Sequence, residues 1–203
     1  MKKTRHIKYY LAASVSLITF IIYLATLRNE FIMWDDSGYI FENRHIRSFD
    51  MTFLKWAFFD FHALNWHPLT WLSHALDYAV WGLNPLGHHL SNNILHAINA
   101  FLVVFLIMKL LESAKERTTQ AGLSEFLTER TILITGGVTG LLFGLHPLHV
   151  ESVAWVSERK DLLCALFFLL SIIQYMRYVQ NALSQRGPRN SLILFSDKFY
   201  LLT

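Results

Sequence analysis

Residues 9–27 read YYLAASVSLITFIIYLATL, a run without a single charged side chain. A helix needs about 20 apolar residues to cross the hydrocarbon core of a bilayer, so this run predicts a transmembrane helix. Lys2, Lys3, Arg5 and Lys8 precede it, a pattern that secretory signal peptides share. The apolar run is longer than a typical signal-peptide core, and no clear small-residue cleavage site follows. We therefore interpret it as an uncleaved signal anchor.

Further apolar segments predict more spans, at residues 89–111, 132–145 and 162–179. The segment 132–145 is short and rich in glycine, which suits close packing against a neighbouring helix. A fifth span is expected near Leu192, although Asp197 and Lys198 interrupt it. Hydrophobic residues make up 53% of the chain and charged residues 16%, where soluble domains carry about 25% charged residues. The sequence thus predicts an all-α polytopic membrane protein with about four to five transmembrane helices.

The basic residues orient these spans. They gather before the first span, between the second and third, and after the fourth, and the positive-inside rule assigns such segments to the cytoplasm. We therefore expect a cytoplasmic N-terminus, a large first external loop at 28–88, a cytoplasmic loop at 112–130 and a second external loop at 146–161. The net charge of +3 gives no basic stripe that would bind nucleic acid. The single cysteine excludes an intramolecular disulfide and a cysteine-based metal cluster.

The first external loop opens with two adjacent acids, Asp35 and Asp36, just past the first span. Paired carboxylates at a membrane surface can act as a general base, ligate a metal or orient a sugar hydroxyl. The alternative is structural: Asp36 would cap a short helix over 37–43. Both interpretations fit the dipeptide.

The same loop is dense in tryptophan and histidine, with Trp66 and His67 at the centre of NWHPLT. Tryptophan often serves only as an anchor in the interfacial aromatic belt. However, apolar residues recur at helical spacing nearby, at Leu69, Leu72, Leu76 and Val80. This stripe predicts an amphipathic helix, within residues 63–81, that lies in the plane of the external interface.

The second span begins with a polar face. His89, Asn92, His96 and Asn99 follow one another at three- and four-residue steps, so they lie on one side of the helix. Polar groups at membrane depth face either a water-filled cavity or a hydrogen-bonding partner. The pattern leaves both interpretations open, and with Trp66 and His67 the first three are candidate cavity-lining residues.

The second external loop concentrates histidines, acids and two adjacent cations in a short segment: His146, His149, Glu151, Glu158, Arg159 and Lys160. Arg159 and Lys160 suit a phosphate at headgroup level. They also suit snorkelling of long basic side chains to the interface. His146-Pro-Leu-His149 resembles a metal-ligand spacing, but a zinc site needs further ligands nearby.

Three blocks of this sequence resemble a known family: WDDSGYI (34–40), NWHPLTWLSHALDYAVWGLNPLGHHLSNNILHAINA (65–100) and LHPLHVESVAWVSERKDLLCALFFLL (145–170). They are similar to the N-terminal membrane half of the transmembrane and tetratricopeptide-repeat family, polytopic proteins of the GT-C glycosyltransferase superfamily with bacterial relatives. The resemblance covers about residues 31–178 and implies a partial GT-C-like fold. It also implies an extracytoplasmic enzyme that transfers a sugar, mannose in the animal members, from a polyprenyl-phosphate donor to a protein hydroxyl or a glycan.

Carried over to this chain, the family's acidic motif implies Asp35 and Asp36 as catalytic residues. The second-loop motif implies donor-phosphate binding by cations and histidines, with two further acids: Arg159, Lys160, His146, His149, Glu151 and Glu158. A divalent cation, if the reaction uses one, would bind at Asp36 and Glu151. The expected partners are membrane lipid, the lipid-linked sugar and the acceptor. The expected membrane is the inner membrane of a bacterium or the endoplasmic reticulum of a eukaryote.

Family members continue through more spans and an array of repeats of about 34 residues. We therefore expect residues 1–203 to form a single, truncated GT-C-like domain. Two other functions compete with catalysis: a non-catalytic membrane anchor or assembly subunit, and half of a transporter. The transporter hypothesis is weaker, because no inverted repeat is visible and the acids lie at the external surface instead of within the spans.

Overall fold

The computed structural model describes residues 2–117 and 125–185. Within these residues the fold is helical, and the one β interaction is an isolated bridge between His62 and Asn65. The chain divides into two compact units, Met1–Leu169 and Leu170–Thr203. The predicted all-α membrane fold is confirmed.

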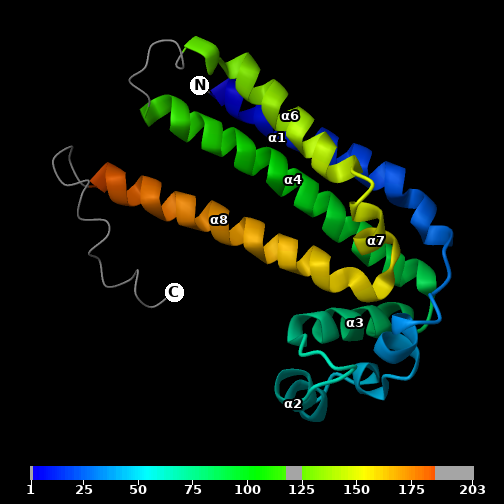
Figure 1. The fold of residues 1–203 in the computed structure, drawn as a ribbon. Coiled ribbons are helices and arrows are strands. Elements are labelled where there is room, and N and C mark those ends of the chain that lie inside the picture. The colour runs from blue at the N-terminus through cyan, green and yellow to red at the C-terminus, as the bar shows by residue number, and fades with distance from the viewer. Residues whose placement is uncertain (1, 118–124, 186–203) are drawn as a thin grey trace. The chain divides into compact units, whose positions relative to one another are not determined.

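Helices α1 (Lys2–Ile22), α4 (Pro85–Arg117) and α6 (Glu129–Leu145) pack side by side in the first unit, and α4 runs antiparallel to the other two (Figure 1). A 3-10 segment, η1 (Tyr23–Arg28), continues α1. Ala12 and Val15 of α1 meet Val104 and Met108 of α4 in a buried apolar cluster. The polar groups of Lys8 and Glu112 pair near the opposite end from η1.

Among the described residues, three helices are long and apolar enough to cross a membrane: His6–Arg28, Pro85–Arg117 and Val156–Ala182. They correspond to the predicted first, second and fourth spans. The predicted third span forms α6, which has 17 residues, at the lower end of the length that a bilayer requires. The predicted fifth span, near Leu192, lies outside the described residues. Of the predicted loop at 112–130, residues 112–117 belong to α4, and Glu129 and Arg130 belong to α6.

The glycines of α6 allow this helix to approach its neighbours closely. A Cβ atom added to Gly140 would lie 2.1 Å from Val104 Cγ2 of α4, and one added to Gly144 would lie 2.3 Å from Thr19 Oγ1 of α1. A Cβ atom does not approach another heavy atom so closely, so α6 or the neighbouring side chain would have to shift if either glycine carried a side chain. The close packing predicted from the glycine-rich segment is confirmed.

The segment between α1 and α4 folds into a compact layer at one end of these helices (Figure 1). It contains four helical elements: η2 (Ser37–Phe41), η3 (Arg44–Arg47), α2 (Met51–Phe59) and α3 (Pro68–Trp81). Its core is built around Trp71 of α3, Phe53 and Trp56 of α2, and Tyr39 of η2. Val156, from the segment after α6, packs into the same core. The predicted first external loop is therefore a folded layer with its own apolar core.

Helix α3 is the predicted amphipathic helix, but it begins at Pro68 and not at 63. Ala63 and Leu64 precede it with φ values of 48° and 62°, in the turn that closes the His62–Asn65 bridge. The apolar stripe divides in two. Leu72 packs against the core, whereas Leu76 and Val80 are 57% and 72% exposed. Placement of this exposed apolar face in the membrane interface remains a prediction.

The segment after α6 forms two short elements, α7 (His149–Ala154) and η4 (Val156–Glu158), before α8 (Arg159–Gln185) begins. Val153 of α7 and Leu162 of α8 pack against Tyr23 of η1. The start of α8 thus belongs to the first unit, and it is held at the end of α1.

Candidate active site

The acidic motif after α1 and the motif before α8 meet at Asp36. Its side chain is fully buried. Oδ1 accepts a hydrogen bond from the backbone N–H of Ser157, 121 residues away and at 2.9 Å, while Oδ2 accepts one from the N–H of Ile32 at 2.9 Å. Asp36 precedes η2, but its side chain does not cap that helix. The capping alternative is therefore wrong, and the carboxylate instead joins two distant segments.

Arg159 lies two residues beyond Ser157 and is also buried. Nη1 forms an ion pair with Asp77 Oδ2 of α3 at 2.5 Å and donates to the carbonyl of Ser73 at 3.3 Å. Nη2 donates to the carbonyl of His88 at 2.8 Å. Nε donates to Asn92 Oδ1 at 2.7 Å.

The guanidinium therefore joins the start of α8 to both α3 and α4. Four of its five N–H groups have acceptors within the protein, and the side chain is 1% exposed. A donor phosphate could reach Arg159 only if the packing around it opened. Charge-assisted hydrogen bonds of this kind are among the stronger interactions in a folded protein. In this arrangement Arg159 holds the segment in place.

Lys160 differs from its neighbour because it is only half-buried. Its Nζ atom lies 2.6 Å from Glu158 Oε1 and 5.7 Å from the centre of the Tyr39 ring. Burial is the main cause that raises the pKa of Tyr39, and the nearby charges of Lys160 and Asp35 act on it in opposite directions. Lys160 and Asp35 therefore both lie near Tyr39, although they belong to the two different motifs that the Asp36–Ser157 hydrogen bond joins.

His67 belongs to the same surroundings. Its pKa is lowered, first by burial and then by the positive charge of Lys160, against an opposing effect of Glu158. A histidine whose pKa lies below 6.5 is neutral at neutral pH. It can then accept or donate a hydrogen bond without adding charge. Asp35, Tyr39, His67, Glu158 and Lys160 are together called the Lys160 cluster below.

A cleft of about 420 Å³ is formed by the segment after η1 together with α7 and the residue that follows it. Its lining residues are Asn29, Glu30, Ile32, Val150, Glu151, Ala154 and Trp155. Glu30 and Glu151 bring two exposed carboxylates to it, and the backbone of Ile32 connects it to Asp36. The size is within the range of small-molecule sites. The predicted residue Glu151 thus lies on the cleft, whereas Asp35 and Lys160 are not among its lining residues.

The two histidines of the second motif lie near the end of α6. His146 is exposed, and its Nδ1 accepts a hydrogen bond from Leu148 N at 3.2 Å. The ring of His149 packs on Phe143, 4.6 Å between centres, and lies 5.6 Å from His96. Burial, followed by the nearby His146, lowers the pKa of His149. Neither histidine forms a described contact with the Lys160 cluster, and their role in donor binding remains a prediction.

The polar face of α4 is buried and hydrogen-bonded to the backbone of other segments. Asn92 Nδ2 donates to the carbonyls of Val153 and Trp155 at 3.2 and 3.1 Å. His96 Nε2 lies 2.9 Å from the Gly144 carbonyl, and Asn99 Nδ2 donates to the Leu162 carbonyl at 2.9 Å. Of the two interpretations left open by the sequence, the structure shows the hydrogen-bonded helix contact.

The other predicted cavity residues are placed differently. His89 is buried beside the Phe31 ring, and Trp66 is 52% exposed with its Nε1–H donated to the Phe58 carbonyl at 2.9 Å. None of Trp66, His67, His89, Asn92 and His96 lines the cleft described above. Asn92 and His96 contact backbone carbonyls instead, and a cavity-lining role for Trp66, His67 and His89 remains a prediction.

Two residues of this region were not singled out from the sequence. Asp77 pairs with Arg159, and Tyr39, within the first motif, lies beside Lys160 of the second. Asp77 carried a usable signal, because it is the only acid in the Pro68–Trp81 segment and a buried carboxylate needs a cationic partner. Tyr39 had no comparable signal, since aromatic residues are common throughout this segment.

The predicted metal ligands, Asp36 and Glu151, remain a prediction. Among the described residues, a group of three side chains with metal-ligating atoms lies elsewhere, at His74, Asp77 and His88.

The chain is similar to several curated proteins. It is 31% identical to "Protein O-mannosyl-transferase Tmtc1" of Drosophila melanogaster over 180 residues, which are 83% of this chain and 18% of that protein. It is 32% identical to "Protein O-mannosyl-transferase Tmtc2" of the same species over 172 residues, 80% of this chain and 16% of that protein. It is 35% identical to human "Protein O-mannosyl-transferase TMTC4" over 128 residues, 63% of this chain and 16% of that protein.

The chain therefore spans less than a fifth of the length of these relatives. No family model matches the sequence. No solved structure matches it either.

Proposed function

The chain belongs to the family of these TMTC protein O-mannosyl-transferases over the segment that it shares with them, and we propose that it takes part in glycosyl transfer to proteins. The sugar would be mannose, the donor a polyprenyl phosphate, and the acceptor a protein hydroxyl. One observation carries the proposal: the hydrogen bond between Asp36 and the N–H of Ser157, which holds the two motifs together. Because of this hydrogen bond, the charges of Asp35 and Lys160 both affect the pKa of Tyr39.

Asp35 is the proposed general base. Unlike Asp36, it is half-buried and so remains accessible from solvent. It would take the proton from the acceptor hydroxyl while the hydroxyl oxygen forms a bond to the anomeric carbon. The bond from that carbon to the phosphate oxygen breaks in the same step, and attack from the opposite face inverts the anomeric centre. Asp36 would position this loop through its two backbone contacts.

Lys160 is the proposed cation for the leaving phosphate. As the carbon–oxygen bond breaks, negative charge develops on the phosphate, and a nearby ammonium group stabilises it. Glu158 pairs with Lys160 at 2.6 Å and would hold its side chain in place. Arg159 would act indirectly, by fixing the start of α8 against α3 and α4. His146 and His149 would then bind outer parts of the donor.

The cleft supplies a second element of the proposal. Glu30 and Glu151 present carboxylates that can accept hydrogen bonds from sugar or acceptor hydroxyls. Carboxylates would repel a phosphate, so we assign the cleft to the sugar or the acceptor and the Lys160 cluster to the phosphate.

The proposed orientation places both motifs outside the cytoplasm, with the N-terminus inside. The membrane would be the endoplasmic reticulum in a eukaryote or the inner membrane in a bacterium. Impermeant maleimide can test the orientation in intact cells that carry a Cys164→Ser background. Labelling is expected at Glu42→Cys, and Lys115→Cys should remain unlabelled until the membrane is permeabilised. The opposite pattern would place the site in the cytoplasm.

The catalytic proposal is tested by mannosyl transfer in membranes that contain the chain and a labelled prenyl-phosphate mannose. Transfer to a hydroxyl-containing acceptor should exceed that of membranes without the chain. Asp35→Asn should lower it by about 100-fold or more, the usual contribution of a general base. Glu42→Gln and Lys55→Ala, which change exposed residues of the same folded layer, should retain it. Transfer that is equal with and without the chain would contradict the proposal.

A further inference from the structure

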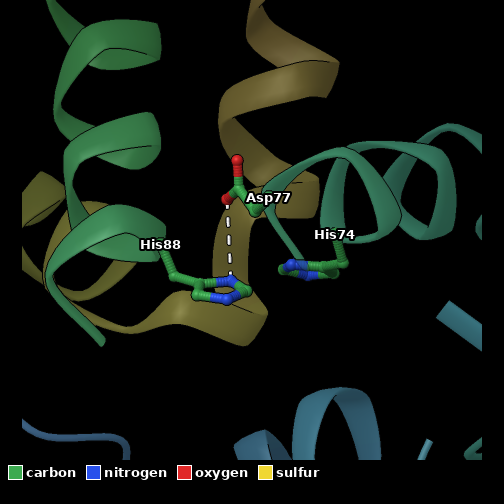
Figure 2. A group of neighbouring side chains, drawn as sticks. All are labelled: His74, Asp77 and His88. Carbon is green, nitrogen blue, oxygen red and sulfur yellow. Dashed lines mark ion pairs between the residues drawn. The ribbon is translucent and has the colours of Figure 1, made fainter. Parts of the chain in front are cut away.

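A buried group of two histidines and one aspartate joins α3 to the first turn of α4. His74 and Asp77 are one helical turn apart on α3, and His88 faces them from α4 (Figure 2). All three side chains are buried. One ligand-type atom from each lies within 4.8 Å of the other two. None of the three lines the cleft, and the ring of His74 lies 6.3 Å from that of Tyr39 in the Lys160 cluster.

The hydrogen bonds of His88 determine which of its nitrogens is free. Nε2 lies 3.0 Å from the Gly82 carbonyl, and a carbonyl can only accept, so Nε2 carries the proton. In the neutral ring, Nδ1 therefore bears a lone pair, and this atom lies 3.6 Å from Asp77 Oδ2 (Figure 2). That separation is too long for an ordinary hydrogen bond. A lone pair and a carboxylate thus face each other without a proton between them.

His74 has an even clearer deficit. Its side chain is fully buried, and neither ring nitrogen has a hydrogen-bond partner among the described residues. A buried imidazole normally satisfies at least one of its nitrogens, because an unpaired polar group in the interior is destabilising. His74 lies against His88, 6.4 Å between ring centres, so a single ligand could engage both rings.

The geometry points to a transition-metal cation of the Zn²⁺ class bound by His74, Asp77 and His88, which we propose as a metal site whose fourth position a water would take. Two imidazoles and one carboxylate form a common donor set for zinc, with bonds of about 2.0–2.2 Å. Tetrahedral ligands at such distances lie about 3.4 Å apart, close to the 3.6 Å between His88 Nδ1 and Asp77 Oδ2. Magnesium and calcium prefer oxygen ligands and fit this set poorly.

Neighbouring groups support the proposed ligands. The bond from His88 Nε2 to the Gly82 carbonyl orients the ring, as the second nitrogen of a metal-bound histidine usually does. Ser91 Oγ donates to Asp77 Oδ1 at 2.6 Å, leaving Oδ2 toward His88. Arg159 also contacts Oδ2, so the carboxylate would be shared between the guanidinium and the metal. The positive charge of Arg159 opposes the binding of a metal cation nearby. The two histidine nitrogens must therefore provide most of the affinity for the metal.

The test uses the chain purified in detergent with an affinity tag that lacks histidine. After treatment with a chelator, Zn²⁺ is titrated in, and bound zinc and the unfolding temperature are measured. We expect about one equivalent of tightly bound zinc and a higher unfolding temperature, because a ligand that binds only the folded state stabilises it. Bound Co²⁺ should give the visible absorption of a tetrahedral site.

His74→Phe and His88→Gln remove one ligand each while keeping most of the buried volume. Either variant should weaken zinc binding more than about tenfold, and the second variant serves if the first does not fold. His6→Gln, a change at an exposed histidine, is the matched control and should bind zinc like the unchanged chain. Absence of tight zinc binding in the unchanged chain would overturn the proposal, and a proton shared by His88 and Asp77 would then take the place of the metal. Zinc binding by both ligand variants that equals binding by the unchanged chain would also overturn it.

Discussion

Removal of the Arg159 guanidinium should destabilise the fold strongly. In Arg159→Met, Asp77 would keep a buried charge without its ion-pair partner at 2.5 Å, and Asn92 Oδ1 would lose its donor at 2.7 Å. Breaking one side of a buried ion pair is destabilising by about 3–5 kcal/mol. For a chain of this size, that corresponds to a fall of roughly 6–20 °C in the unfolding temperature.

A double-mutant cycle separates the pair from other effects. Asp77→Asn removes the charge from the carboxylate, and the double variant Arg159→Met, Asp77→Asn leaves no buried charge at this position. We expect the double variant to be more stable than the sum of the single changes predicts, with a coupling energy of about 0.5–3 kcal/mol. Unfolding by sodium dodecyl sulfate in mixed micelles, followed by tryptophan fluorescence, provides the measurement.

Arg44→Met is the control, because Arg44 is exposed and such changes usually stay within about 0.5 kcal/mol. If Arg159→Met unfolds like the control but no longer binds the lipid-linked donor, the guanidinium of Arg159 is free to bind phosphate. That result would refute its assignment as a buried clamp.

Three further predictions follow from the packing and the charges. Gly140→Val should lower the unfolding temperature more than Ala114→Val at an exposed position, because a Cβ at Gly140 would lie 2.1 Å from Val104 Cγ2. Equal effects of the two substitutions would contradict the close approach of α6 and α4. The pKa of His149 is lowered in the folded chain, so as the pH falls below 6.5 the unfolded chain binds a proton first. The free energy of unfolding should therefore decrease as the pH drops through this window, by less than about 1.4 kcal/mol per pH unit. His149→Asn should flatten that slope in pH-dependent unfolding, and an unchanged slope would be evidence against it. Leu76→Asp, in the exposed face of α3, should reduce quenching of tryptophan fluorescence by brominated lipid, and unchanged quenching would place α3 away from the bilayer.

The sequence predicted the helices well because their signal is local. Uncharged runs of bilayer length identified the segments that form α1, α4 and α8, and the glycines identified the tight contact of α6. The extent of α3 was overestimated at its start, since the turn at Ala63 and Leu64 has no strong sequence signal of its own.

The candidate site was predicted as two motifs, but not as a geometry. The partner of Asp36 is a backbone N–H 121 residues away, and backbone groups carry no sequence signature. The partner of Arg159 is Asp77, a single acid in an apolar helix. Periodicity could show that this acid lies on α3, but not which cation it meets. For the same reason the sequence could not decide whether the polar face of α4 lines a cavity or contacts another helix. The structure decides it, because the side chains of this face contact the carbonyls of Val153, Gly144 and Leu162.

Photocrosslinking of a lipid-linked sugar tests the central claim most directly. The probe is a prenyl-phosphate mannose with a photoreactive group near the phosphate, added to membranes that contain the chain. Mass spectrometry should find the adducts in residues 30–39 and 155–161, competed by unlabelled prenyl-phosphate mannose and reduced by Lys160→Ala but not by Lys55→Ala. Adducts that are confined to the other end of the helices, near Lys8 and Glu112, or that are unaffected by Lys160→Ala, would contradict a donor site at the Lys160 cluster.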